Sequence, residues 1–229
     1  MQPYFFPYVG YFQLINAVDE FVVYDNIEYT KKGWINRNRI LVDGKDAYIS
    51  LPLRKDSDFL QVKDRQLADT WPADRKKMLN RITESYRKAP QFAQVFPVLE
   101  ACLLFEDHNL FNFIFHSIRK VNEFLDISTK LVISSTIPIN HQLKAEEKVK
   151  AICCSQQANV YMNPIGGLEL YSKESFRSSG IELLFHKSKS ITYPQFKNEF
   201  VPWLSIIDVM MFNPKETVKD FLSEYDTIT

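Results

Sequence analysis

The stretch Met1-Gln2-Pro3-Tyr4-Phe5-Phe6-Pro7-Tyr8-Val9-Gly10-Tyr11-Phe12 opens the chain and organises the rest of it. Its two prolines and its glycine exclude one continuous helix and predict the end of a strand followed by a shaped loop. The apolar spacing after Gly10 predicts a short helix over residues 10–18 that leaves this loop. The free amides at the start of such a helix suit an anion, for example a phosphate or a carboxylate.

Two interpretations of this loop stay open. Aromatic side chains usually form part of the core. Hydroxyls and amides need hydrogen-bond partners one by one, however, which favours contacts with a ligand. The second interpretation assigns those contacts to the polar members of the loop, which are Gln2, Tyr4, Tyr8 and Tyr11.

Length and composition limit the class of protein. The chain has 229 residues, of which 45% are hydrophobic, and this predicts one globular domain over residues 1–229. Lys and Arg number 28, as do Asp and Glu, so the formal net charge is zero. No overall field favours nucleic acid or an anionic membrane, and an anionic substrate would need a local cluster of cations.

Cysteines and apolar runs indicate the compartment. The three cysteines are Cys102, Cys153 and Cys154, an odd number without C-x-x-C spacing, which predicts neither a disulfide framework nor a metal site. The first residues lack the basic start of a signal peptide, and no stretch offers the roughly 18 apolar residues of a membrane span. We therefore expect a cytoplasmic protein without integral membrane contact.

The order of predicted elements indicates an α/β fold. Residues 20–25 read as a strand after the first helix, and strand-helix-strand units recur after residue 130, which predicts a mainly parallel sheet. A β-hairpin and a helical insertion at about residues 69–126 complete this prediction. Asp25 ends the strand, where ligands of parallel sheets gather, although Asp25-Asn26 is equally consistent with a simple turn.

The predicted hairpin turns at Val42-Asp43-Gly44-Lys45, because Asp-Gly readily adopts positive φ angles. Near its start it presents Lys32, Trp34, Asn36 and Arg37. Cations and an indole suit the phosphate and the ring of a sugar nucleotide, whereas a run of charges is more often a solvated face.

Later segments add further candidates. A strand over residues 130–133 delivers Ser134 and Ser135, which would either cap the next helix or bind a phosphate oxygen. Tyr193 and Gln195 are candidates for ligand contact. Asp208 lies in an apolar helix predicted over residues 203–211, where an acid must be paired, capped or functional. It is the first candidate for a general base, with structural pairing to an arginine as the alternative.

The sequence also resembles the WbqC-like family, bacterial proteins encoded among O-antigen and other surface-polysaccharide genes. The resemblance spans nearly the whole chain, and it favours the ligand-binding interpretation of the hairpin. It implies a role in polysaccharide assembly as a glycine transferase. The segments that carry it are Gln2 to Pro7, Gly10 to Ile15, Tyr29 with Lys32, Trp34 to Asn38, Tyr86 with Ala89-Pro90, Ser134-Ser135, Tyr193 with Gln195, and Leu204 to Asp208.

Three functions follow as expectations. The first is transfer of an acyl or aminoacyl (glycyl) group from a small-molecule donor to a nucleotide-linked sugar, with Asp208 or Asp25 accepting a proton and no cofactor. The second is a non-catalytic sugar-nucleotide-binding or scaffold protein. The third is a divergent nucleotidylyl-transferase-like enzyme in which Tyr8-Val9-Gly10-Tyr11 replaces an H-x-G-H loop; because both histidines are absent, adenylyl transfer of the usual kind is not expected.

Overall fold

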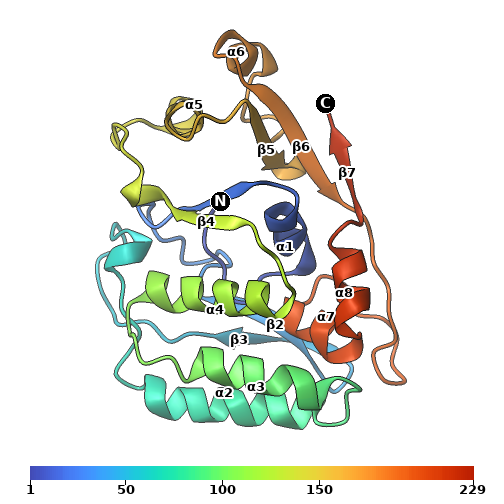
Figure 1. Ribbon diagram of the computed structural model, residues 1–229. Coiled ribbons are helices and arrows are strands. Elements are labelled where there is room, and N and C mark those ends of the chain that lie inside the picture. Colours follow the sequence, from blue (N-terminus) through green and yellow to red (C-terminus); the bar gives the residue numbers. More distant parts are fainter.

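The computed structural model describes residues 1–229 and has an α/β fold, as predicted (Figure 1). Its strands form three small sheets instead of one continuous sheet. Strand β1 (Glu20–Val23) pairs in parallel with β4 (Lys130–Ile133). Strands β5 (Val160–Pro164), β6 (Glu182–Ser188) and β7 (Tyr225–Ile228) form a second sheet, in which β5 and β6 are parallel and β7 is antiparallel to β6.

The third sheet is the predicted hairpin of β2 (Arg37–Val42) and β3 (Lys45–Ser50). Asp43 and Gly44 at its tip have φ angles of 49° and 75°. Positive φ at both central residues is the geometry of a type I′ turn, whose twist matches that of the flanking strands. The hairpin prediction is therefore confirmed, with Val42 directly opposite Lys45.

Eight α-helices surround these sheets. Figure 1 shows α2 and α3 at the opposite end of the molecule from α6 and β5. Three of the helices lie within the segment predicted to be helical at about residues 69–126, namely α2 (Trp71–Tyr86), α3 (Phe92–Leu103) and α4 (Leu110–Phe124). The others are α1 (Val9–Asn16), α5 (Ala145–Ser155), α6 (Lys173–Ser178), α7 (Ile206–Phe212) and α8 (Lys215–Phe221). None of the helices combines the length and apolarity that crossing a bilayer requires.

The aromatic side chains of the opening stretch form part of the main core. Phe5, Phe6 and Phe12 are fully buried within a cluster of 43 buried residues, together with Trp71 and Phe113. Burying each phenylalanine contributes about 1.5–3 kcal/mol relative to an exposed ring. A second cluster of six buried residues lies between β5, β6, α5 and α6.

The structure differs from the predicted elements at both ends of the chain. No strand precedes the opening loop; instead the Met1 ammonium donates to the Val22 carbonyl (2.6 Å), and Tyr24 N–H donates to the Met1 carbonyl (2.8 Å). The helix predicted from Trp203 begins only at Ile206, because Trp203 has a φ of 60°. The last helix, α8, ends at Phe221, and Tyr225 begins the edge strand β7.

Candidate functional site

A polar network forms where β1 and β4 end side by side. The Ser134 hydroxyl lies 2.8 Å from Asp25 Oδ1 and 2.7 Å from Asn26 Oδ1. Ser135 N–H donates to the same Asp25 oxygen at 2.9 Å. Because parallel strands deliver their following residues to one edge, residues distant in sequence meet here. The sequence-predicted residues Asp25, Ser134 and Ser135 are therefore in direct contact.

Asn26 joins this edge to two basic side chains. Its amide Nδ2 lies 3.0 Å from His141 Nδ1, while Lys148 Nζ donates to its Oδ1 at 3.4 Å. His141 Nε2 lies 3.0 Å from the Ile137 carbonyl, an acceptor, so Nε2 carries the hydrogen and Nδ1 accepts from Asn26. We call Asp25, Asn26, Ser134, His141 and Lys148 the Asp25 network.

Lys148 differs from an ordinary surface lysine. Burial lowers its pKa; the nearby Asp25 carboxylate opposes this, and the charge of Lys63 reinforces it. Its ammonium lies 5.5 Å from the centre of the Tyr24 ring, a cation–π contact. An amine in such surroundings loses its proton at lower pH than a solvated lysine does.

Asp25 retains one unused oxygen. The side chain is only 3% exposed, and Oδ1 accepts both hydrogen bonds from Ser134 and Ser135. Oδ2 accepts no hydrogen bond, and it is not completely enclosed by other atoms. The carboxylate is thus held through one oxygen, while the other has no hydrogen-bond partner.

Asp208 is placed differently. It is fully buried, with Oδ1 accepting from Tyr86 (2.8 Å) and Oδ2 accepting from Tyr193 (2.8 Å) and Gln195 (2.6 Å). Burial raises the pKa of this carboxyl, and the bonds from Tyr193, Tyr86 and Gln195 oppose that rise. The partners of this acid are two tyrosines and a glutamine, with no arginine among them, and its role as a general base stays a prediction.

The predicted contact residues Tyr193 and Gln195 thus point into the core. Gln195 Oε1 also accepts from Val201 N–H at 2.7 Å, and Tyr86 Oη accepts from Leu41 N–H at 2.8 Å. Asp208 therefore ties together the 193–201 segment, helix α2 and strand β2.

The opening loop is anchored by side chains from two other segments. Asn38 Nδ2 donates to the carbonyls of Phe5 (3.1 Å) and Phe6 (2.9 Å), and Ser205 Oγ donates to the Phe6 carbonyl at 2.7 Å. Phe6 has a φ of 41°, a strained angle for a residue with a side chain. The loop, the hairpin and the start of α7 therefore meet. Their contacts are hydrogen bonds to the buried backbone carbonyls of the loop.

The polar side chains of the loop contact mostly one another. Tyr11 is 2% exposed and donates to the Gln2 carbonyl at 2.9 Å, while Tyr4 donates to Gln2 Oε1 at 3.2 Å. The Tyr8 ring packs edge-on against exposed Trp203, with ring centres 6.0 Å apart. Two of the three tyrosine hydroxyls are thus satisfied within the loop itself.

The hairpin residues remain close to the surface. Arg37 donates to the carbonyls of Gly33 (3.0 Å) and Lys32 (2.7 Å), so its guanidinium shapes the loop before β2. Trp34 is 39% exposed and stacks on Tyr48, with ring centres 6.2 Å apart. No hydrogen bond or ion pair connects these residues with the Asp25 network. The Arg39 guanidinium also lies over the Trp34 ring, 5.6 Å from its centre, so the structure already gives this indole two ring contacts.

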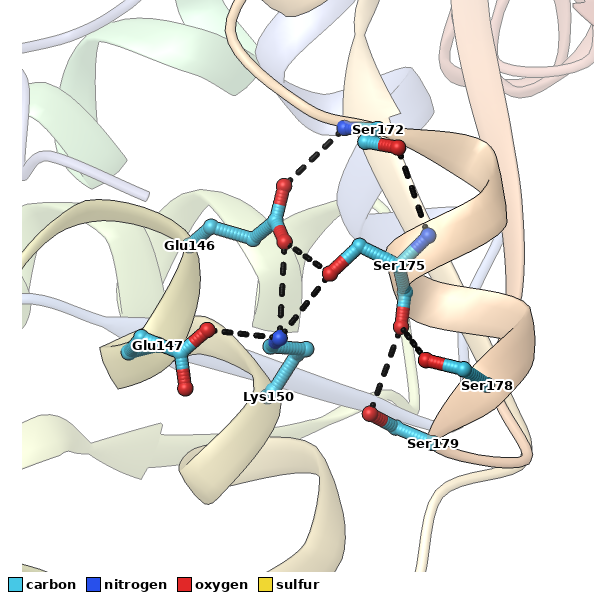
Figure 2. Close-up of polar contacts among 7 residues, drawn as sticks. All are labelled: Glu146, Glu147, Lys150, Ser172, Ser175, Ser178 and Ser179. Atoms are coloured by element: carbon cyan, nitrogen blue, oxygen red, sulfur yellow. Dashed lines mark hydrogen bonds and ion pairs between the residues drawn. The ribbon is translucent and has the colours of Figure 1, made fainter.

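A second polar cluster holds α5 against α6 (Figure 2). Lys150 Nζ lies 3.0 Å from Ser175 Oγ, which resembles a nucleophile and its base. Hydrogen bonds from Lys150 to Glu147, and more weakly to Glu146, raise its pKa, so it stays protonated and cannot accept the hydroxyl proton of Ser175. Glu146 in turn accepts from Ser175 Oγ and from Ser172 N–H at 2.9 Å. The hydrogen bonds of this cluster therefore hold α5 and α6 together.

The model of the WbqC-like protein family matches residues 2–220. The chain belongs to this family. A similar relative is the uncharacterized protein Rv1507c of Mycobacterium tuberculosis, which is 29% identical over 225 residues, covering 97% of this chain and 95% of the relative. No solved structure matches.

Sequence reasoning missed several residues that organise this WbqC-like protein. Asn38 belongs to the Trp34 to Asn38 segment that carries the family resemblance, and the signal that could have revealed its role is that asparagine is uncommon in strands and, when buried, needs hydrogen-bond partners. Nothing local signals His141 or Lys148, which lie 115 and 122 residues from Asn26. No three His, Cys, Asp or Glu side chains come together as a metal-binding group.

Proposed function

We propose that this member of the WbqC-like family is a transferase of bacterial surface-polysaccharide (O-antigen) assembly. It would move an acyl or aminoacyl group, such as glycyl, onto a nucleotide-linked sugar. The observation that carries this proposal is the Asp25 network, which places a carboxylate with one unused oxygen near a lysine whose pKa is lowered by burial. A carboxylate and an ammonium close to the carboxyl ends of parallel strands suit acid-base chemistry on a bound substrate.

Asp25 accepts the proton in this mechanism. Its Oδ2 removes the hydrogen of the attacking amino or hydroxyl group of the sugar as that group forms a bond to the acyl carbon. The bond between the acyl carbon and the donor's leaving group then breaks, and the leaving group departs with the electron pair. Ser134 and Ser135 hold Oδ1, so Oδ2 keeps one direction throughout the reaction. We prefer Asp25 to Asp208 because both oxygens of Asp208 are occupied.

Lys148 stabilises the charge that develops on the acyl carbonyl oxygen. A cation that is partly withdrawn from water interacts more strongly with such a charge than a solvated one does. Only the protonated amine can do this, and the pKa of Lys148 is lowered. Activity is therefore expected to fall with rising pH below the ordinary lysine value of 10.5.

The test has two stages. Nucleotide sugars are screened by their effect on thermal unfolding, and the sugar that binds is then incubated with acyl and aminoacyl donors and analysed by mass spectrometry. The proposal predicts a product heavier by the transferred group. Binding without any covalent change would favour the alternative, a sugar-nucleotide-binding or scaffold protein.

Three variants assign the roles. Asp25→Asn keeps the acceptor oxygen for Ser134 and Ser135 and is expected to lower kcat by about 10²–10⁴-fold without loss of substrate binding. Lys148→Gln is expected to lower kcat and to remove the alkaline limb of the pH profile. Asp220→Asn is the matched control, since Asp220 is exposed and forms no ion pair. Equal activity of Asp25→Asn and Asp220→Asn would contradict the mechanism.

A further inference from the structure

A cleft of about 530 Å³ lies beside the 53–58 segment, with Tyr29 in its lining. Its lining combines residues from the start of the hairpin, from this segment and from Arg65. Asn36, predicted from sequence to bind substrate, lies in its wall. The lining is polar and mostly charged, which fits a charged ligand better than an apolar one.

Arg65 is the unusual member of the lining. It is only 5% exposed, yet no carboxylate lies within ion-pair distance of its guanidinium. One terminal nitrogen donates to the Ser57 carbonyl at 2.7 Å, whereas Nε has no partner. A buried cation without a counter-charge is costly, and a buried donor left without an acceptor adds to that cost.

Tyr29 does not supply the missing negative charge. The Arg65 guanidinium lies over its ring, 4.3 Å from the centre. The phenol donates to Asn36 Oδ1 at 2.8 Å, and Asn36 Nδ2 donates to the Leu51 carbonyl at 2.8 Å. Burial raises the pKa of the Tyr29 hydroxyl, so it stays neutral. Tyr29 and Asn36 thus form a fixed, uncharged wall beside the cation.

Most other charges of the lining are compensated. Lys31 pairs with Asp58 at 2.7 Å, and Arg54 pairs with Asp69 at 2.8 Å. Lys55 and Asp56 are both exposed, and neither forms an ion pair. The lining therefore has two unpaired cations, the buried Arg65 and the exposed Lys55, against one unpaired carboxylate, Asp56, which leaves an excess of positive charge.

We propose that this cleft binds a phosphoryl group, with Arg65 on the floor and Lys55 at the rim. A guanidinium presents a planar set of donors that matches phosphate oxygens, and an ammonium adds a point charge. The Tyr29–Asn36 wall restricts how far the phosphoryl group can move.

The position of the cleft also indicates that the phosphoryl group belongs to the nucleotide-linked sugar, an inference that rests on the proposed function. Residues 25–29 run beside residues 60–63, with Lys63 N–H donating to the Asp25 carbonyl at 3.0 Å and Tyr29 N–H to the Leu60 carbonyl at 3.2 Å. Four residues span at most about 14 Å. A nucleotide-linked sugar is long enough to place its diphosphate in the cleft and its sugar at the Asp25 network.

Pyrophosphate binding to the full chain tests the cleft without any turnover. We expect saturable binding in calorimetry, weakened about tenfold by Lys55→Gln and by Arg65→Lys, which keeps the charge but loses the planar fork. Lys197→Gln, a change at another exposed lysine without an ion pair, is expected to bind as the unchanged protein does. Acetate, a small carboxylate, is expected to bind at least tenfold more weakly than pyrophosphate.

A second measurement needs no substitution. The guanidinium signals of Arg65 in an NMR spectrum are expected to shift as pyrophosphate is added, because an anion then lies beside this cation. Unchanged guanidinium signals, or equal affinity of Lys55→Gln and Lys197→Gln, would overturn the cleft assignment. Either result would leave the transfer reaction open to its own test. Conversely, if the protein binds pyrophosphate but transfers no acyl or aminoacyl group, the phosphoryl-binding cleft would be supported and the proposed transferase activity would be refuted.

Discussion

Replacing Asp208 by asparagine removes the acceptor that three buried donors share. Tyr86, Tyr193 and Gln195 all donate to this carboxylate at 2.6–2.8 Å. An asparagine has one acceptor oxygen, so its NH₂ group must face at least one of these donors. If the oxygen serves Tyr193 and Gln195, the Tyr86 hydroxyl loses its acceptor.

The expected loss of stability follows from that one mismatch. A hydrogen bond to a charged group contributes about 1.5–3 kcal/mol, and relief from burying a charge offsets part of it. We therefore expect Asp208→Asn to unfold about 1–2 kcal/mol more easily, which for a chain of this length lowers Tm by about 2–8 °C. Tyr193→Phe, which removes one donor and leaves Gln195 on the same oxygen, is expected to cost about 1 kcal/mol.

The raised pKa of Asp208 also predicts how the stability of the protein changes with pH. Burial raises the pKa of Asp208 above its ordinary value of 3.8, so the native state holds this proton to higher pH than the unfolded chain does. Between 3.8 and the raised value the native state binds more protons, and stability therefore falls as the pH rises. In Asp208→Asn this contribution is absent.

Urea unfolding at several pH values measures both effects, with activity assayed on the folded fraction. The structure predicts that the variant is less stable at neutral pH, that the difference between the proteins grows toward low pH, and that activity per folded molecule is retained. An unchanged midpoint together with complete loss of turnover would refute this reasoning. It would restore Asp208 as the general base.

Other predictions concern single contacts. Asn38→Ala leaves the Phe5 and Phe6 carbonyls with fewer donors, and we expect a loss of about 2 kcal/mol in denaturant unfolding; wild-type stability would mean that Asn38 does not hold the loop. Gly10→Ala places a methyl group 2.3 Å from Ser188 Oγ and 2.4 Å from the Tyr8 ring, so Tyr8 should leave Trp203, seen as a change in tryptophan fluorescence. Lys150→Met should lower stability and leave activity per folded molecule unchanged, whereas its inactivation would make Ser175 a candidate nucleophile.

Local sequence signals determined much of the secondary structure. Asp43-Gly44 fixed the hairpin register because few other residues accept positive φ at adjacent positions. Proline and apolar spacing placed the helical segment at about residues 69–126, which contains α2, α3 and α4. Asp25 and Ser134 were each predicted to follow a strand, which the structure confirms, but their contact appears only once β1 and β4 pair in parallel and carry both to one edge.

Tertiary structure alone decided which side chains face the site and which face the core. The sequence offered Tyr193 and Gln195 as ligand contacts and Asp208 as a general base, and in the structure all three are hydrogen-bonded to one another inside the protein. His141 and Lys148 reach Asn26 only because the chain folds back after β4, and no local pattern encodes a contact over 115 residues. The buried, unpaired state of Arg65 is likewise invisible in sequence, because burial and pairing are properties of the packed chain and not of any single segment.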